Sequence, residues 1–162
     1  MSKLEGELGI LARRRIEAEI IKPIYEILKR EQGKDFAAAV IGEAVGNAAI
    51  QAGKHFASLE ERADLKSFVE LQVLWEKDDA LKVEIIASDA EHYDYDVKRC
   101  RYAEMYTEMG LGEIGHLLSC NRDELFIVGY NPNIELTRTQ TIMGGAPSCD
   151  FRYHAKPREP RS

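Results

Sequence analysis

The residues of this sequence best suited to covalent chemistry are three cysteines, which stand far apart at positions 100, 120 and 149. A cysteine nucleophile needs a lowered pKa or an adjacent base. Cys120 is followed by Arg122 and Asp123, which supply a cation and a carboxylate within three residues. Glu104 follows Cys100 by four residues and is a candidate acid or base if both face one cavity. The alternative is that each cysteine is a small buried hydrophobic residue and that Asp123 caps a helix.

The segment around Cys120 also contains part of a metal-binding set. His116 and Cys120 are four residues apart, so they would share one face of a helix. Cys149 or His154 would complete a site if the fold brought either of them close. Because the cysteines form no CxxC pair, their spacing does not indicate structural zinc. We therefore expect no cofactor, with a divalent metal as the alternative.

Arg138 lies in a segment whose alternation places it on the same face as three aliphatic residues, Ile134, Leu136 and Ile142. A buried arginine needs a partner. A bound carboxylate would supply one, because an arginine fork holds a carboxylate with two hydrogen bonds. If the segment is instead an edge strand, Asp150 or Glu135 would pair with Arg138.

The first 80 residues have the apolar periodicity of helices, which we expect at 4–30, at 36–56 and from residue 58 to about 77–79. Pro23 lacks an amide donor, so the first helix is predicted to be kinked or divided there. Ser58 and Glu61 would form a capping box for the third helix. The second is rich in Ala and Gly, and the spacing of Gly42 and Gly46 favours close packing, either in the core or at a dimer seam.

After residue 80 the apolar period changes to two, which predicts antiparallel strands. We expect a hairpin of strands at 81–85 and 93–97, and further strands at 134–143 and 149–154. Short helices are expected at 102–109 and within 111–130. This order predicts an α+β fold with N-terminal helices packed on a roughly four-stranded antiparallel sheet. Residues 1–156 would form one domain, followed by a disordered tail at 157–162.

Composition excludes several classes of protein. The chain has 162 residues, of which 44% are hydrophobic and 31% charged, as in a globular protein. No stretch approaches the roughly 18 apolar residues that span a bilayer, and the first residues do not resemble a secretory signal. The net charge of −6 argues against nucleic acid as a partner. An odd number of cysteines favours reduced thiols, so we expect a cytoplasmic protein without a membrane or nucleic-acid partner.

Four sequence blocks, in order, resemble the L-2-amino-thiazoline-4-carboxylic acid hydrolase family. They are RCRYAEMY at 99–106, CNRD at 120–123, LTRTQTIMGGA at 136–146 and CDFRY at 149–153. The N-terminal ILARRRIEA at 10–18 is similar as well, so the resemblance covers nearly the whole chain. The order of helices and strands, with a late Gly-Ala-x-x-Cys-x-Phe, is also similar to the 4-vinyl reductase small-molecule-binding domains.

The first resemblance implies a hydrolase that opens a cyclic amidine. The family name implies that 2-amino-thiazoline-4-carboxylate and water give S-carbamoyl-cysteine through cleavage of a ring C–N bond. A related small heterocyclic carboxylate is the alternative substrate. The implied partner is a small molecule, and we expect a homo-oligomer, with a dimer as its form.

The resemblance also suggests a role for each candidate residue. Arg138 or Arg122 would hold the substrate carboxylate. Cys120 or Cys149 would add to the amidine carbon or help to hold a metal that activates water. Glu104 or Asp123 would transfer protons. The remaining expected substrate-binding residues are Cys100, Thr139 and Gly145, the last through backbone amides of the Gly144-Gly145 loop.

Two other classes of function stay open. The protein would be a non-catalytic module of the 4-vinyl reductase type if its cavity binds a metabolite or a metal without turnover. It would be an interaction protein if the Ala- and Gly-rich helix is a dimer seam. Turnover separates the first alternative from the hydrolase, because a binding protein gains thermal stability with its ligand but forms no product.

Overall fold

The computed structural model of the protein describes residues 8–156 as α-helices followed by an antiparallel sheet, which confirms the α+β prediction. The expected tail at 157–162 lies outside the described residues. The helices are α1 (Ile10–Gln32), α2 (Lys34–Ser58), α3 (Leu65–Glu76), α4 (Arg101–Glu108) and α5 (Asn121–Tyr130). The strands are β1 (Leu81–Ser88), β2 (His92–Cys100), β3 (Ile134–Thr137) and β4 (Cys149–Ala155). Two short turns, the 3₁₀ turn η1 (Lys77–Asp79) and the π-helical turn η2 (His116–Cys120), complete the order.

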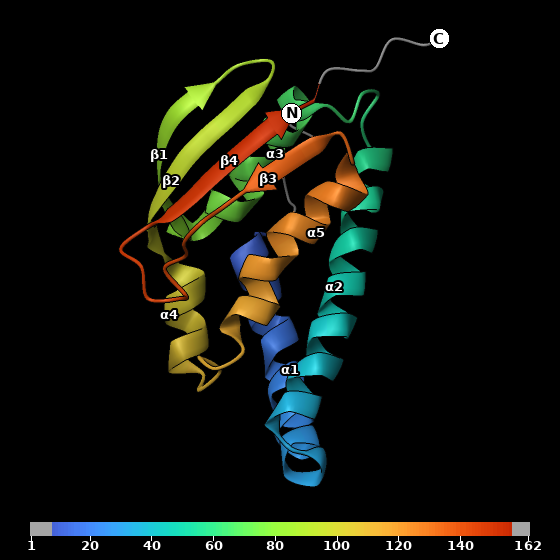
Figure 1. The fold of residues 1–162 in the computed structure, drawn as a ribbon, viewed down its shortest axis with the longest axis vertical. Helices are drawn as coiled ribbons and strands as arrows, with labels where there is room; N and C mark the ends of the chain where they lie inside the picture. Colours follow the sequence, from blue (N-terminus) through green and yellow to red (C-terminus); the bar gives the residue numbers. More distant parts are fainter. Residues whose placement is uncertain (1–7, 157–162) are drawn as a thin grey trace.

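The four strands form one sheet in the order β1-β2-β4-β3, with every neighbouring pair antiparallel (Figure 1). Alternation gives this sheet one buried face, which carries Tyr93, Tyr95, Val97, Cys149, Phe151 and Tyr153. Tyr95 of β2 stands opposite Phe151 of β4, and their rings stack with centroids 4.8 Å apart. Cross-strand aromatic pairs of this kind stabilise a sheet and fix its register.

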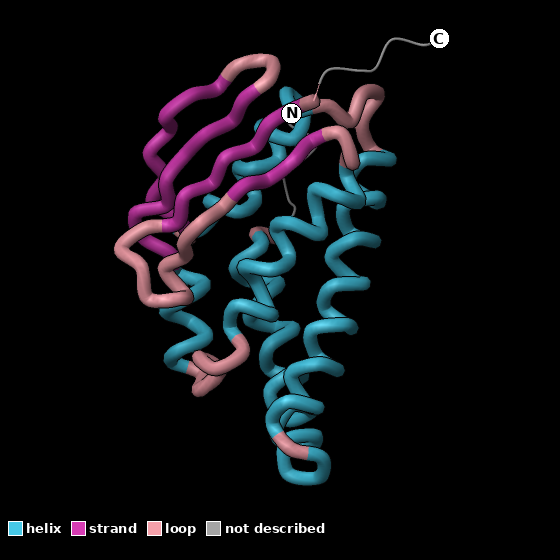
Figure 2. The backbone as a smooth tube through the Cα atoms, viewed as in Figure 1, coloured by secondary structure: helices cyan, strands magenta, loops and turns pink. Residues whose placement is uncertain are grey.

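Helices α3 and α5 lie against this aromatic face. The ring of Phe68 in α3 lies 4.9 Å from that of Tyr153 in β4 and 6.3 Å from that of Phe126 in α5. Figure 2 shows the result as two regions, with the strands gathered on one side of the molecule and the helices on the other. The interior where the sheet meets α3 and α5 is the place at which a cavity can form.

Helix α2 packs closely along α5, and glycines make the approach possible. A Cβ atom at Gly53 would lie 2.1 Å from the carbonyl oxygen of Phe126, and one at Gly129 would lie 2.2 Å from that of Ile50. The side chains of Leu117 and Leu125 lie over Gly42 and Gly46 respectively. The glycines of α2 therefore pack within the core, which is the first of the two alternatives for this helix.

Two helix boundaries differ from the sequence prediction. α2 continues to Ser58, and α3 begins only at Leu65. Asp64, not Ser58, caps α3. Its carboxylate accepts a hydrogen bond from the Ser67 amide at 3.0 Å, and the Ser67 hydroxyl oxygen accepts one from the Asp64 amide at 3.0 Å. Reciprocal bonds of this type satisfy amides that would otherwise lack a partner at a helix start. The Ser58 hydroxyl instead donates a hydrogen bond to the His55 carbonyl within α2.

Helix α1 runs unbroken through Pro23, so the division into two helices is wrong. Pro23 lies on the exposed side of the helix, where water can bind the carbonyl that proline leaves without a donor. The apolar repeat on this helix also faces outward in part, since Ile16 is 58% exposed and Ile20 is 64% exposed. Within the described residues, no helix is both long enough and apolar enough to cross a membrane.

The third predicted strand is shorter than its alternating pattern. β3 ends at Thr137, although the pattern continues to 143. The Asp150 carboxylate accepts the backbone amides of Thr139 and Gln140, each at 2.9 Å, and it also binds the Thr139 hydroxyl. These bonds turn the chain away from the strand direction, because the two amides point at one carboxylate instead of at a neighbouring strand.

The contact between α2 and α5 predicts the effect of a single added methyl group. Gly53→Ala should lower the free energy of unfolding by about 1–3 kcal/mol, because its Cβ meets rigid backbone. Gly112→Ala is the matched control, since no atom lies within 4 Å of its Cβ position, and it should change stability by less than about 0.5 kcal/mol. Urea denaturation followed by circular dichroism measures both. Equal stability of the two variants would contradict this account of the helix contact.

Candidate functional site

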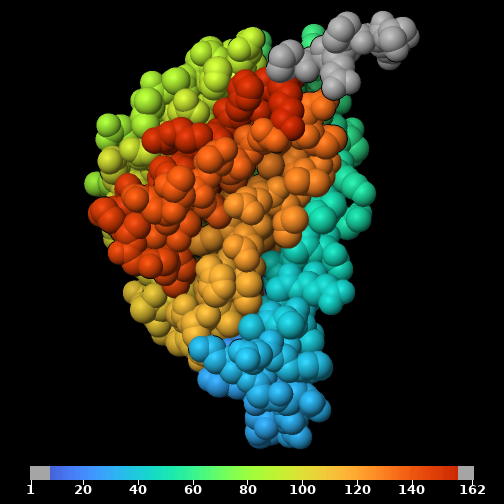
Figure 3. All heavy atoms as spheres, in the orientation of Figure 1, coloured from blue at the N-terminus to red at the C-terminus, as the bar shows by residue number. Residues whose placement is uncertain are grey.

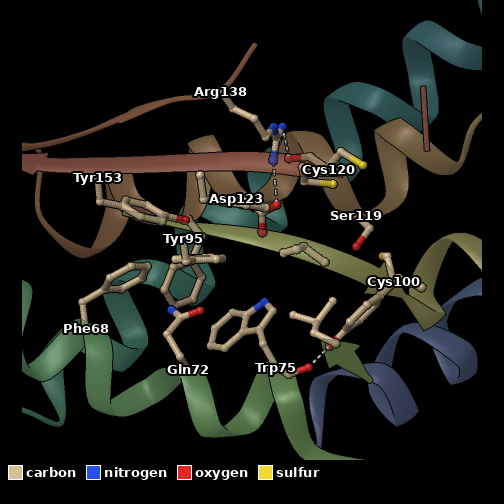
Figure 4. A pocket seen from close by; sticks show the side chains of 16 residues that line it. Phe68, Gln72, Trp75, Tyr95, Cys100, Ser119, Cys120, Asp123, Arg138 and Tyr153 are labelled. Atoms are coloured by element: carbon tan, nitrogen blue, oxygen red, sulfur yellow. Dashed lines mark hydrogen bonds and ion pairs between the residues drawn. The ribbon is translucent and has the colours of Figure 1, made fainter. Parts of the chain in front are cut away.

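A cavity lies between the aromatic face of the sheet, helix α3 and the start of α5 (Figure 4). It has a free volume of about 50 Å³. All three cysteines line it: Cys100 from the end of β2, Cys120 from η2 and Cys149 from the start of β4. On the face drawn in Figure 3, the orange-to-red atoms of β3, β4 and their connection lie together over the sheet. Most of the side chains that line the cavity are buried, so it is an interior site.

The π-helical turn η2 brings polar groups to this cavity. It places Ser119 and Cys120 in the lining and continues directly into α5, which adds Asp123 one turn later. π-helical turns are rare and occur frequently at functional sites. His116, at the start of the same turn, is exposed and does not line the cavity with Cys120.

A largely buried ion pair forms the polar end of the cavity. The Arg138 Nη1 donates to Asp123 Oδ2 at 3.0 Å, and Nη2 donates to the Cys120 carbonyl at 2.9 Å. The guanidinium also lies 5.0 Å from the centre of the Phe151 ring. The Arg138 side chain is only 6% exposed, so this arginine has the partner that burial requires. That partner is Asp123, not Asp150 or Glu135.

Asp123 has the protonation behaviour of a general base. Burial raises its pKa to about 6, while the charge of Arg138 and its hydrogen bond limit the rise. A carboxylate with this pKa is largely ionised at neutral pH but can also accept and return a proton. Carboxylates with raised pKa values occur preferentially at functional sites.

The three thiols have the opposite character to an activated nucleophile. Burial raises the pKa of Cys120 to about 12 and that of Cys100 to about 11, and it also raises the pKa of Cys149. The nearby Asp123 raises the pKa of Cys120 further, against the opposing effect of Arg138. All three cysteines are free. They are therefore neutral thiols at physiological pH, because burial disfavours the charged thiolate.

The structure brings together five of the candidate residues, namely Cys100, Cys120, Cys149, Asp123 and Arg138. Thr139 lies outside this lining because its hydroxyl and amide bind Asp150. Gly145 lies in the β3–β4 connection with a φ of 101°, a conformation that serves the turn. Neither residue lines the cavity.

Two charged candidates also lie elsewhere. Glu104 is on α4, where it pairs with Arg99 at 3.2 Å on the exposed surface. Arg122 is buried between helices: its Nε donates to the Leu118 carbonyl at 3.0 Å and its Nη2 to Glu17 at 3.0 Å. Burial, and then the neighbouring Arg14, lower the pKa of Arg122 to about 10. Its bonds connect α5 to α1, so this arginine holds the fold together.

The proposed histidine ligands are separated from the cavity as well. His116 is exposed, and His154 stacks on His92 with ring centroids 4.8 Å apart. Between residues 8 and 156, no group of three His, Cys, Asp or Glu side chains is arranged to hold a metal ion. The cavity residues as placed therefore do not form a ready metal site.

Sequence reasoning missed the wall that faces the ion pair. Gln72 and Trp75 of α3 enter the lining from the opposite side, with Tyr95 and Tyr153 of the sheet between (Figure 4). The signal for Gln72 was present, because it stands four residues after Phe68 on the apolar face of the helix. A polar residue on such a face indicates either a buried partner or a ligand.

The raised thiol pKa values predict slow alkylation. At pH 7.5 Cys100 and Cys120 of the folded protein should react with iodoacetamide at least about a hundredfold more slowly than free cysteine, and Cys149 should also react more slowly, because the thiolate is the reacting form. Mass spectrometry of the modified peptides measures the three rates separately. Protein unfolded in urea is the control, in which all three should react readily. Fast alkylation of Cys120 or Cys149 in the folded protein would contradict the raised pKa values and support a thiolate nucleophile.

Comparisons with known proteins identify a family and a similar fold. A model of the L-2-amino-thiazoline-4-carboxylic acid hydrolase family matches residues 13–153. No curated protein sequence matches the chain significantly. Among solved structures, the phenol-responsive sensory domain of the transcription activator PoxR with phenol has a similar fold. The TM-score is 0.52 at 10% identity, over 85% of this chain and 73% of that one. Since the family model spans most of the chain, the protein belongs to the L-2-amino-thiazoline-4-carboxylic acid hydrolase family.

Proposed function

We propose that the protein hydrolyses a small cyclic amidine, such as 2-amino-thiazoline-4-carboxylate, inside the aromatic cavity. The observation that carries this proposal is the buried Arg138–Asp123 pair, which gives an otherwise aromatic and thiol-lined cavity one cationic and one basic group. An anionic ring substrate needs both, and membership of the hydrolase family supports the reaction type.

Asp123 is the proposed base. Its carboxylate takes a proton from water as the water oxygen adds to the amidine carbon, forming a tetrahedral intermediate. The same carboxyl group then returns the proton to the ring nitrogen as the ring C–N bond breaks. Formation of the carbonyl gives S-carbamoyl-cysteine, and the overall change is the addition of one water. The pKa of about 6 allows Asp123 to act in both directions near neutral pH.

Arg138 is the proposed carboxylate-binding group. Two of its five N–H bonds are used by Asp123 and by the Cys120 carbonyl, which leaves others for a ligand. A carboxylate bound beside Asp123 would place the ring over the Phe151 and Tyr95 side chains. Cys100, Cys120 and Cys149 then contribute soft, neutral contacts to the ring and its sulfur.

The cavity must widen when such a ligand binds. Its volume of about 50 Å³ is smaller than the roughly 150 Å³ of a cavity that holds benzene. We therefore expect side chains of the lining to move apart on binding. Any ligand that stabilises the widened form should raise the melting temperature.

A second candidate function is a small-molecule sensor without turnover. It is favoured by the likeness in fold to the phenol-responsive sensory domain. The neutral thiols and the aromatic walls suit a small ring in either case. Product formation distinguishes the two functions.

We also propose the environment and the assembly of the protein. Three free thiols suit a reducing compartment, so a cytoplasmic location stays our prediction. The homo-oligomer, with a dimer as its form, also stays a prediction.

Turnover is the direct test of the hydrolase. Purified protein incubated with 2-amino-thiazoline-4-carboxylate should convert it to a product that gains one water, by mass spectrometry. C–N cleavage predicts a new free amine and no new free thiol. Asp123→Asn should reduce the rate at least about a hundredfold, because the amide still accepts a hydrogen bond from Arg138 but cannot act as a base.

The controls for turnover separate the alternatives. Glu104→Gln should retain the wild-type rate, since Glu104 lies outside the cavity. A chelator-treated sample tests a metal, whose requirement would appear as lost product. Binding without product in the wild type would support the sensor and contradict the hydrolase.

The raised pKa of Asp123 predicts the pH dependence of hydrolysis. kcat/KM should fall about tenfold per pH unit below pH 6, because protonation of the carboxyl group removes the base. Above pH 7 it should stay level until another group titrates. Cys120→Ser and Cys149→Ser, which keep Asp123, should give the same acidic limb. A rate that instead rises steeply above pH 9, and is abolished by either serine variant, would indicate a thiolate nucleophile.

A further inference from the structure

We infer that the side chain of Gln72 recognises the substrate ring through the ring's adjacent hydrogen-bond donor and acceptor. This inference rests on the proposed function and concerns which substrates the cavity selects. Gln72 belongs to α3 and is only 8% exposed. Its carboxamide forms no hydrogen bond or ion pair with any residue between 8 and 156. Gln72 nevertheless lines the cavity.

A carboxamide that has no protein partner and is accessible only from a mainly apolar cavity is poorly satisfied. Leaving its donors and acceptor unpaired destabilises the folded state, and buried polar groups in proteins are normally hydrogen-bonded. The surroundings of Gln72 in the cavity are mainly aromatic, with Phe68, Trp75 and Tyr95 nearby. Figure 4 shows the amide rising from α3 toward the cavity, across from Asp123 and Arg138. A ligand in the cavity is therefore the natural partner for this group.

The chemistry of the carboxamide determines which ligand fits. It presents an acceptor oxygen and a donor nitrogen side by side. A neutral cyclic amidine presents a donor amino group and an acceptor ring nitrogen side by side, and a lactam presents the same pair reversed. Either forms two matched bonds with Gln72, whereas a phenol hydroxyl forms one. With its carboxylate at Arg138, an amidine ring would direct this edge toward Gln72.

The test compares two ligands that differ at this edge. 2-Amino-thiazoline-4-carboxylate has the amidine, and thiazolidine-4-carboxylate has a similar ring and carboxylate without it. Binding is measured by calorimetry in the Asp123→Asn background, so that no ligand is consumed. Gln72→Met removes the polar atoms at nearly constant length, and Gln51→Met, at an exposed position of α2, is the matched control.

We expect the amidine to bind at least about tenfold more tightly than the thiazolidine when Gln72 is present. Gln72→Met should reduce this ratio to within about threefold and leave thiazolidine binding unchanged. Without ligand, Gln72→Met should raise the melting temperature by about 2–4 °C, because a carboxamide without a protein partner is removed from a mainly apolar cavity. Gln51→Met should alter neither quantity.

Other outcomes overturn the inference in distinguishable ways. An unchanged ratio in Gln72→Met, or a lower melting temperature, would assign Gln72 a structural role and leave the proposed function intact. If neither sulfur-containing ring binds, the proposed function fails. Pyroglutamate, a lactam carboxylate, then decides the inference: binding that Gln72→Met weakens at least tenfold supports it, and absence of binding overturns it.

Discussion

The ion pair between Arg138 and Asp123 is the interaction on which the interior of this protein depends. Two opposite charges removed from water are tolerated only with close geometry and further hydrogen bonds. The 3.0 Å contact and the bond to the Cys120 carbonyl meet this requirement. The pair joins the end of β3 to the start of α5 and thereby closes the sheet over the helices. It also gives an apolar cavity its one strongly polar region.

The same burial decides the character of the carboxyl and thiol groups in the cavity. Removal from water disfavours charge, so it makes a carboxylate more basic and a thiol less acidic. Asp123 becomes a useful proton acceptor for that reason, while Cys120 is held as a neutral thiol. A single physical cause therefore moves the chemistry of this site from the sulfur atoms to the carboxylate.

The sequence predicted the elements and the residue types of the site, but not its pairings. Alternation revealed the buried face that carries Tyr95 and Phe151, and the cysteines, Asp123 and Arg138 were recognised by type. Which residues meet depends on contacts between distant segments. Glu17, 105 residues before its partner, binds Arg122 and keeps it from the cavity. The raised pKa values of the thiols could not be predicted from the sequence for the same reason, because burial is a property of the fold.

The π-helical turn that carries Ser119 and Cys120 has a consequence for how relatives of this protein diverge. A π turn holds one residue more than the α turn it replaces. A one-residue deletion within 116–120 would therefore restore a regular α turn and leave α5 in its register, because the π turn had absorbed the extra residue. Only the side chains of the turn itself, Ser119 and Cys120 among them, would be repositioned against the cavity. A length change of one codon is thus a short evolutionary route to a different pocket on the same scaffold.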